Sequence, residues 1–202
     1  MIEAIIFDGD HTLYFPQTNQ AYDRKFSFLE EETGIPKERI REEWEGIVDE
    51  IKDDPNPEKR TREYSIMKTL KSLSIRNPEI LTERALKRFW KSIEKNLEVR
   101  DDTKEILEDL RDKYTLIIAS DEFKNRLEGK LNSFLGDWDE YFELMVTPEK
   151  TASMKPSENY YEIVLDRLDI KPMKILMIGD SWKRDLEPAQ RLGIKTVLIC
   201  KQ

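Results

Sequence analysis

The chain begins with a short apolar run that stops at two closely spaced carboxylates. The run is Ala-Ile-Ile-Phe at residues 4–7, and Asp8 and Asp10 follow it. An unbroken apolar run is typical of a strand that is buried on both faces of a parallel sheet. Two like charges about 4 Å apart repel by about 4 kcal/mol at an effective dielectric constant of 20. We therefore expect a bound cation at this strand end, where carboxylate oxygens suit Mg²⁺.

The second half of the chain alternates between strand-like and helical patterns. Each short apolar run there is separated from the next by a segment with helical periodicity. This alternation is typical of an α/β fold, in which helices cover both faces of a parallel, Rossmann-like sheet. With the first strand included, the predicted strands cover residues 4–7, 115–119, 144–146, 175–178 and 196–199.

A long helical segment interrupts this pattern after the first strand. From about residue 19 to residue 97, apolar residues recur at helical spacing, as Ile40, Trp44 and Ile47 do. Four such stretches can bury their apolar faces against one another as a small bundle. We therefore predict an α/β core domain formed by residues 1–15 and 99–202, and an inserted helical domain formed by residues 16–98. Hinges between them are expected at residues 13–18 and 98–102.

Composition excludes several classes of protein. The 202 residues include 34 basic and 42 acidic side chains, a net charge of −8, and the basic residues are interleaved with acidic ones. This arrangement argues against a nucleic-acid partner. With one cysteine (Cys200) and one histidine (His11), the chain offers no intramolecular disulfide, no cysteine-based zinc site and no plausible Ser/His/Asp triad. We see no signal peptide and no run of transmembrane length, so we expect a cytoplasmic protein without a membrane partner.

Polar residues follow several of the predicted strands. Ser120 follows residues 115–119, and Asp180 follows residues 175–178, with Asp185 about one helical turn further on; Lys155 lies in the loop after residues 144–146. Ligands of open α/β sheets bind outside the carboxyl ends of the strands. We therefore expect these groups to meet Asp8 and Asp10 at one edge of the sheet.

Taken singly, each of these residues has a simpler explanation. Asp180 or Ser181 could cap the helix that follows, Asp8 and Asp10 could be turn residues, and Lys155 could be a solvated loop lysine. Their combination, in this order and at these strand ends, favours an active site.

On these motifs the chain resembles the haloacid dehalogenase-like (HAD) hydrolase superfamily, and the resemblance covers all 202 residues. The insertion has the position and helical content of that family's helical cap. Two departures, His11 and Asp121, replace residues that are more often glycine or asparagine in the family and leave the catalytic set intact. The matching motifs are Asp8-Gly9-Asp10-His11-Thr12, the strand-end Ser120, Lys155-Pro156, and Gly179-Asp180-Ser181 with Asp185.

The resemblance implies a role for each motif. Asp8 would be the nucleophile that attacks phosphorus, and Asp10 would act as general acid and then as general base. Thr12, Ser120 and Lys155 would bind the phosphoryl group. Mg²⁺ would be held by Asp8, Asp10 (through its backbone carbonyl) and Asp180, with support from Asp185.

The resemblance leaves the reaction open among several activities. Dehalogenases of this family release halide, which needs no protonation, and they lack an aspartate at the position of Asp10. Asp10 therefore favours a Mg²⁺-dependent phosphatase, and a helical lid of this size suggests a small phosphorylated metabolite as its substrate. A 2-haloacid dehalogenase and a phosphomutase remain alternatives.

A non-enzymatic receiver module is a further alternative. Receivers also gather aspartates, a hydroxyl and a lysine around Mg²⁺. However, they carry the phosphorylated aspartate on an interior strand and have no helical insertion after the first strand. For His11 we expect packing beneath the inserted domain, because a lone histidine is more often structural.

Overall fold

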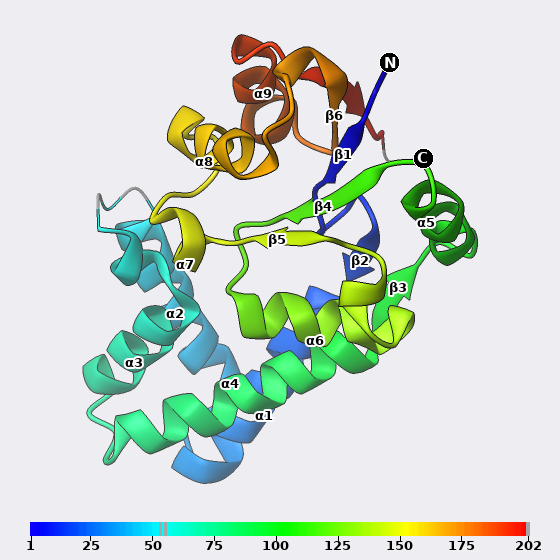
Figure 1. Ribbon diagram of the computed structural model, residues 1–202. Helices are drawn as coiled ribbons and strands as arrows, with labels where there is room; N and C mark the ends of the chain where they lie inside the picture. The colour runs from blue at the N-terminus through cyan, green and yellow to red at the C-terminus, as the bar shows by residue number, and fades with distance from the viewer. Residues whose placement is uncertain (53, 55, 201–202) are drawn as a thin grey trace. The chain divides into compact units, whose positions relative to one another are not determined.

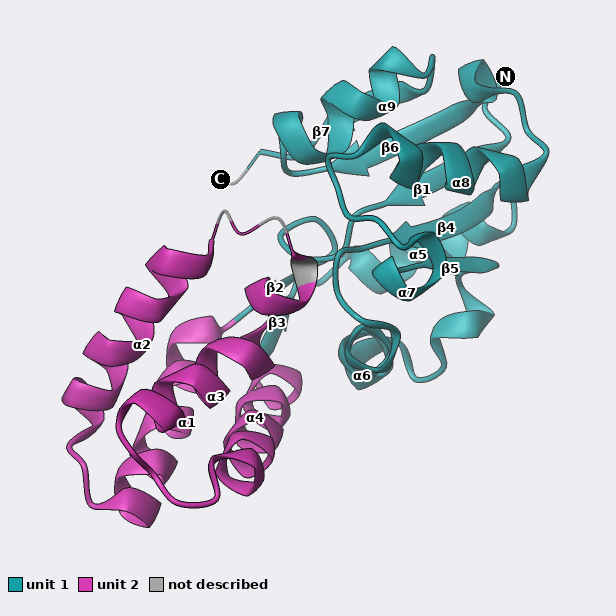
Figure 2. Ribbon diagram, turned by 90° about the vertical axis from the view of Figure 1, so that its left-hand side faces the viewer, with its two compact units in different colours: residues 1–16, 97–202 teal, residues 17–96 magenta. Residues whose placement is uncertain are grey.

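The computed structural model describes residues 1–52, 54 and 56–200. The chain divides into two compact units (Figure 2): Met1–Pro16 with Leu97–Gln202 form unit 1, and Gln17–Asn96 form unit 2. Within the described residues, no helix is both long and apolar enough to cross a bilayer.

Unit 1 is built on a five-stranded parallel sheet (Figure 1). Its strand order is β5-β4-β1-β6-β7, so the first strand lies at the centre. Ile6 of β1 pairs with Ile117 of β4 on one side and with Met177 of β6 on the other. The predicted α/β class is therefore confirmed. The strands are β1 (Ala4–Phe7), β4 (Thr115–Ala119), β5 (Leu144–Val146), β6 (Ile175–Gly179) and β7 (Lys195–Leu198).

Successive residues of the strands enter two different hydrophobic cores. Ile6 packs in one core with residues of α8 (Glu158–Leu168) and α9 (Glu187–Arg191). Ile5 packs in the other with residues of α5 (Thr103–Arg111) and α6 (Lys124–Leu135). Because helices cover both faces, every residue of β1 is buried, which explains its unbroken apolar run. Shorter elements complete unit 1: α7 (Pro148–Thr151), η2 (Trp138–Glu140), η3 (Pro172–Lys174) and the π-helical turn η4 (Trp182–Leu186).

Sequence reasoning missed a second, two-stranded sheet. β2 (Tyr14–Pro16) pairs antiparallel with β3 (Leu97–Val99), and Phe15 lies opposite Glu98. Both strands fall in or beside the segments that we predicted as hinges. Each has only three residues, which is too short for a periodic pattern, and their pairing joins segments far apart in the sequence.

Unit 2 is helical. Its 3₁₀ turn is η1 (Pro57–Arg60), and its longer helices are α1 (Thr18–Thr33), α2 (Lys37–Ile51), α3 (Arg62–Ser72) and α4 (Pro78–Lys95). Helix α1 ends at Gly34, whose φ of 71° lets its N–H reach the carbonyl of Glu30. The fully buried side chains of Phe26, Ile40 and Leu70 join three of the helices in one core.

A lysine is buried inside unit 2. Lys25 of α1 has no exposed surface, and its Nζ has no hydrogen-bond partner among the described residues. Its Nζ lies 4.2 Å from the ring centre of Trp44, 4.3 Å from that of Phe26 and 4.7 Å from that of Tyr22. Burial lowers the pKa of Lys25 to about 6. The aromatic faces attract the ammonium and offset only part of this cost.

We expect Lys25→Met to stabilise the protein against urea by about 2–4 kcal/mol at pH 7. The pKa of Lys25 lies below the usual 10.5 in the folded state, so folding at pH 7 must release a proton. This cost falls as the pH rises toward 10.5, and the advantage of methionine should shrink with it. Lys71→Met, at an exposed position of α3, is the control and should change little. Equal or lower stability of Lys25→Met at pH 7 would show that the rings fully stabilise the ammonium.

Candidate active site

The loop after β1 places the first two carboxylates. The N–H of Asp8 continues the sheet ladder by donating to the carbonyl of Ile178 at 2.9 Å. The chain then reverses, because the N–H groups of Thr12 and Leu13 both donate to the carbonyl of Gly9, at 3.2 and 3.0 Å. This turn brings the Thr12 hydroxyl within 3.4 Å of Asp8 Oδ2, to which it donates.

A tight π-helical turn after β6 places the carboxylate of Asp185. Leu186 N–H donates to the carbonyl of Ser181 at 3.3 Å, and Ser181 N–H donates to Asp185 Oδ2 at 3.0 Å. These bonds fold the buried Asp185 back against the end of β6. A Cβ on Gly179 would lie 2.6 Å from the Cβ of Asp185, so only glycine leaves room for this carboxylate. Asp180 directly follows Gly179, the last residue of β6.

Three of the predicted metal ligands lie together. Asp8, Asp180 and Asp185 each offer a carboxylate oxygen, and these oxygens lie within 4.8 Å of one another. An all-oxygen donor set suits a hard cation such as Mg²⁺. Three carboxylates and one ammonium, that of Lys155, carry a net charge of −2 when ionised, which a divalent cation would balance. The residues present therefore fit Mg²⁺. The carboxylate of Asp10 is not part of this group.

Lys155 lies between two of these carboxylates. Its Nζ forms ion pairs with Asp8 Oδ1 and, at 2.7 Å, with Asp185 Oδ1, and it donates to the carbonyl of Ala119 at 3.3 Å. Burial alone would lower the pKa of Lys155, but Asp8 and Asp185 outweigh it and hold that pKa well above the usual value. The ammonium is therefore charged at neutral pH.

The ionised form of Asp8 remains disfavoured despite this pairing. Burial raises its pKa to about 6, an effect that exceeds the opposing influence of Lys155, and the nearby Asp185 raises it further. In the absence of a further cation, this group of side chains holds more negative charge than its environment favours.

The loop that carries Lys155 is fixed by Asp121. The backbone N–H of Lys155 donates to Asp121 Oδ1 at 2.8 Å, and the guanidinium of Arg184 pairs with the other oxygen of Asp121. Sequence reasoning noted Asp121 as a possible helix cap and as a departure from the family pattern, and missed its role and that of Arg184. The available signal was a carboxylate directly after Ser120.

The backbone and the hydroxyl of Ser120 are both held by hydrogen bonds. Its N–H donates to the carbonyl of Val146 at 3.0 Å, and its carbonyl accepts from the Tyr160 hydroxyl at 3.0 Å. Its Oγ accepts from the N–H of Glu122 at 3.1 Å. Since Oγ is an acceptor in this bond, its proton can be directed at a ligand oxygen.

Asp10 is paired with a lysine that sequence reasoning missed. Lys130 Nζ lies 2.7 Å from Asp10 Oδ1 and 3.1 Å from Asp10 Oδ2. The next residue, His11, has a φ of 65° and a ring centre 5.9 Å from that of Phe15. The expected packing of His11 beneath the inserted domain stays a prediction.

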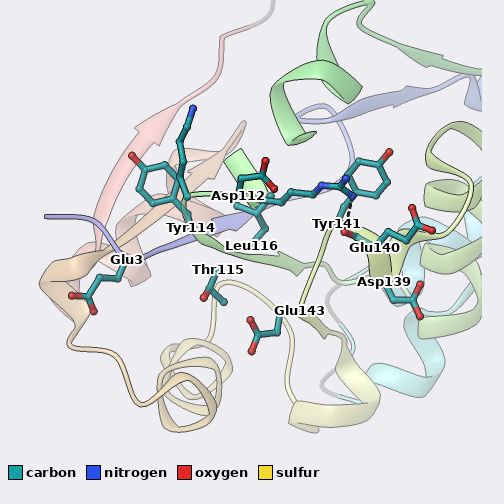
Figure 3. A pocket seen from close by; sticks show the side chains of 11 residues that line it. Glu3, Asp112, Tyr114, Thr115, Leu116, Asp139, Glu140, Tyr141 and Glu143 are labelled. Carbon is teal, nitrogen blue, oxygen red and sulfur yellow. Dashed lines mark hydrogen bonds between the residues drawn. The ribbon is translucent and has the colours of Figure 1, made fainter. Parts of the chain in front are cut away.

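The hollow drawn in Figure 3, of about 690 Å³, lies elsewhere in unit 1. It is lined by residues at the amino ends of three strands, among them Glu3, Thr115 and Glu143. The predicted site residues lie at the opposite, carboxyl ends of the strands. This hollow is therefore distinct from the candidate active site.

Comparison with known proteins agrees with the fold. The family model for haloacid dehalogenase-like hydrolases matches residues 5–199. The chain therefore belongs to this hydrolase family. A ribulose-1,5-bisphosphate 5-phosphatase from Halopiger xanaduensis is 29% identical over 206 residues, which cover 98% of this chain and 85% of that protein.

Solved structures in the family share the fold. A 2-haloacid dehalogenase from Pseudomonas syringae superposes with a TM-score of 0.72 at 20% identity, covering 98% of this chain and 86% of the other. A putative β-phosphoglucomutase from Thermotoga maritima also gives a TM-score of 0.72, at 23% identity, with 100% and 87% coverage. At these identities the likeness establishes the fold and leaves the reaction open.

Proposed function

We propose that the protein is a Mg²⁺-dependent phosphatase that hydrolyses a small phosphomonoester through an aspartyl-phosphate on Asp8. The observation that carries this proposal is the meeting of Asp8 with Asp180, Asp185 and Lys155 at the carboxyl edge of the sheet. The full-length resemblance to a sugar-bisphosphate phosphatase supports it. Unit 2 is the predicted cap, and this assignment stays a prediction.

In the first step, a carboxylate oxygen of Asp8 attacks phosphorus. The new O–P bond forms as the bond from phosphorus to the ester oxygen breaks, and the departing alcohol takes a proton from Asp10. Two anions must approach each other for this to happen. The ammonium of Lys155 and the hydroxyls of Ser120 and Thr12 would stabilise the phosphoryl oxygens during the transfer.

In the second step, water attacks the same phosphorus. Asp10, now ionised, takes a proton from the water, and the bond between phosphorus and Asp8 breaks. Inorganic phosphate leaves, and both carboxyl groups return to their starting states. Mg²⁺ held by Asp8, Asp180 and Asp185 would supply positive charge next to the phosphoryl oxygens.

Asp10 favours a phosphatase over a dehalogenase. An alkoxide leaving group needs a proton, whereas a halide does not, and Asp10 lies two residues after the nucleophile with its side chain 36% exposed. This partial exposure would let it serve both the alcohol and the water. A phosphomutase would use the same residues but pass the phosphoryl group to an alcohol.

Removal of divalent cations is expected to abolish turnover. We predict that EDTA lowers the rate on every hydrolysed ester by at least about 100-fold, because three carboxylates would then repel the incoming phosphate. Adding Mg²⁺ in excess should restore the rate. The test is phosphate release from a panel of phosphorylated sugars, including ribulose 1,5-bisphosphate, and p-nitrophenyl phosphate.

Three outcomes of this panel would overturn the proposal. Full activity after exhaustive chelation would contradict the metal site. Release of halide from 2-haloacids, with no phosphate released from any ester, would assign the chain to the dehalogenases. Stoichiometric phosphorylation without turnover would favour the receiver alternative.

A further inference from the structure

Lys130 carries a buried charge, and the reaction proposed above gives it no role. It lies on α6, whose neighbouring Leu127 and Leu131 pack into a hydrophobic core under the sheet. Its side chain is only 2% exposed, yet it ends in an ammonium. Burying a charged ammonium this deeply is costly unless polar or charged groups pair with it.

The partners of Lys130 lie on the loops that form the candidate active site. Both oxygens of Asp10 lie within hydrogen-bond distance of its Nζ, at 2.7 and 3.1 Å. Glu122, two residues after Ser120, offers a carboxylate oxygen 4.0 Å from the same nitrogen. Lys130 thus spans from α6 to the carboxyl ends of β1 and β4. Contact with both oxygens of Asp10 constrains the plane of that carboxylate as well as its position.

Fold stability alone is a weak reason for such a residue. Replacing a buried ion pair with apolar groups of similar volume is often neutral or stabilising. The other buried residues of α6 are leucines, so methionine or leucine would suit this position in a purely structural helix. The backbone of the Asp8–Thr12 loop is already fixed by its own hydrogen bonds to Gly9. Lys130 adds constraint where the loop bonds do not, at the Asp10 side chain.

We propose that Lys130 is a positioning residue that holds the Asp10 carboxylate in the orientation from which it exchanges protons with the leaving alcohol and with water. The proposal rests on the proposed phosphatase function. It concerns the side chain that sets the geometry of the acid–base step, and Lys130 itself does not touch the substrate.

The test compares two substrates in Lys130→Met. With an alkyl phosphate, kcat is expected to fall about 100-fold with little change in KM, because a displaced Asp10 no longer protonates the alcohol. With p-nitrophenyl phosphate, the leaving group needs no proton, so the first turnover should stay fast. Hydrolysis of the phosphorylated Asp8 still needs Asp10, so a burst of p-nitrophenolate that approaches the enzyme concentration should precede a slow steady state.

A double-mutant cycle gives a second readout. If Lys130 acts through Asp10, Lys130→Met should cost almost nothing further in the Asp10→Asn background. This double variant also removes both charges of the pair, so it is expected to fold even if Lys130→Met alone does not. Leu135→Ala, a buried position on the same helix, controls for loosened packing and should show no burst.

The outcomes separate this inference from the proposed function. Equal losses on both substrates without a burst, or full additivity with Asp10→Asn, would overturn the role of Lys130 while the phosphatase remains. Failure of the unaltered chain to hydrolyse any phosphate ester would overturn both.

Discussion

Asp8→Asn is expected to lower the hydrolysis of every phosphate ester by at least about 10⁴-fold, because the amide cannot serve as the nucleophile that accepts the phosphoryl group. The substitution keeps the shape of the side chain and changes only its chemistry. The measurement is phosphate release under saturating Mg²⁺ with the best substrate of the panel. A rate above about one per cent of the unaltered chain would show that another group attacks phosphorus.

The same variant should be more stable than the unaltered chain when no metal is present. Burial raises the pKa of Asp8 from 3.8 to about 6, so the folded state disfavours its ionised form. This cost develops as the pH rises through that interval and reaches about 2–3 kcal/mol at pH 7. Asparagine carries no charge and avoids it. Asp109→Asn, at an exposed position of α5, is the matched control and should leave both rate and thermal midpoint unchanged.

Lys155→Met is expected to damage both catalysis and stability. It removes the ammonium between Asp8 and Asp185 and leaves two buried carboxylates without a counter-charge. Loss of one partner from a buried charge group costs about 3–5 kcal/mol of stability. The rate should fall by at least about 10³-fold, because the positive charge that meets the phosphoryl group is gone.

Mg²⁺ separates these two effects of Lys155→Met. The cation is expected to recover part of the lost stability, since it neutralises the same carboxylates, but not the rate. Thermal unfolding and steady-state kinetics with and without Mg²⁺ measure both. The control is Lys150→Met, at an exposed position of α7. If Lys155→Met kept near-normal kcat, the phosphate-binding role of Lys155 would be wrong.

Sequence patterns predicted the sheet well because burial on two faces leaves an unambiguous signal. The apolar runs at residues 115–119 and 144–146 are strands with the predicted bounds, and the predicted ends of β6 and β7 differ from the observed ones by one residue. β2 and β3 could not be predicted in this way. Their pairing depends on two three-residue segments that only the folded chain brings together.

The candidate site likewise contains residues that the sequence could predict and residues that it could not. Residues directly after strands, such as Asp8 and Asp180, could be proposed because topology alone predicts that parallel strand ends share an edge. Lys130 and Arg184 reach the site from helical segments, so their contribution depends on side-chain direction. A lysine within the apolar stripe of α6 was the only hint in the sequence, and periodicity alone does not separate it from a solvated lysine.

The most direct test of this account is a rapid acid quench during turnover of a radiolabelled phosphate ester with Mg²⁺, followed by digestion and peptide mapping. The account predicts a labile phosphoryl group on the peptide that contains Asp8, formed at least as fast as the ester is hydrolysed and absent in Asp8→Asn. Continued turnover with no phosphorylated peptide at any time, or with the phosphoryl group on another residue, would contradict it.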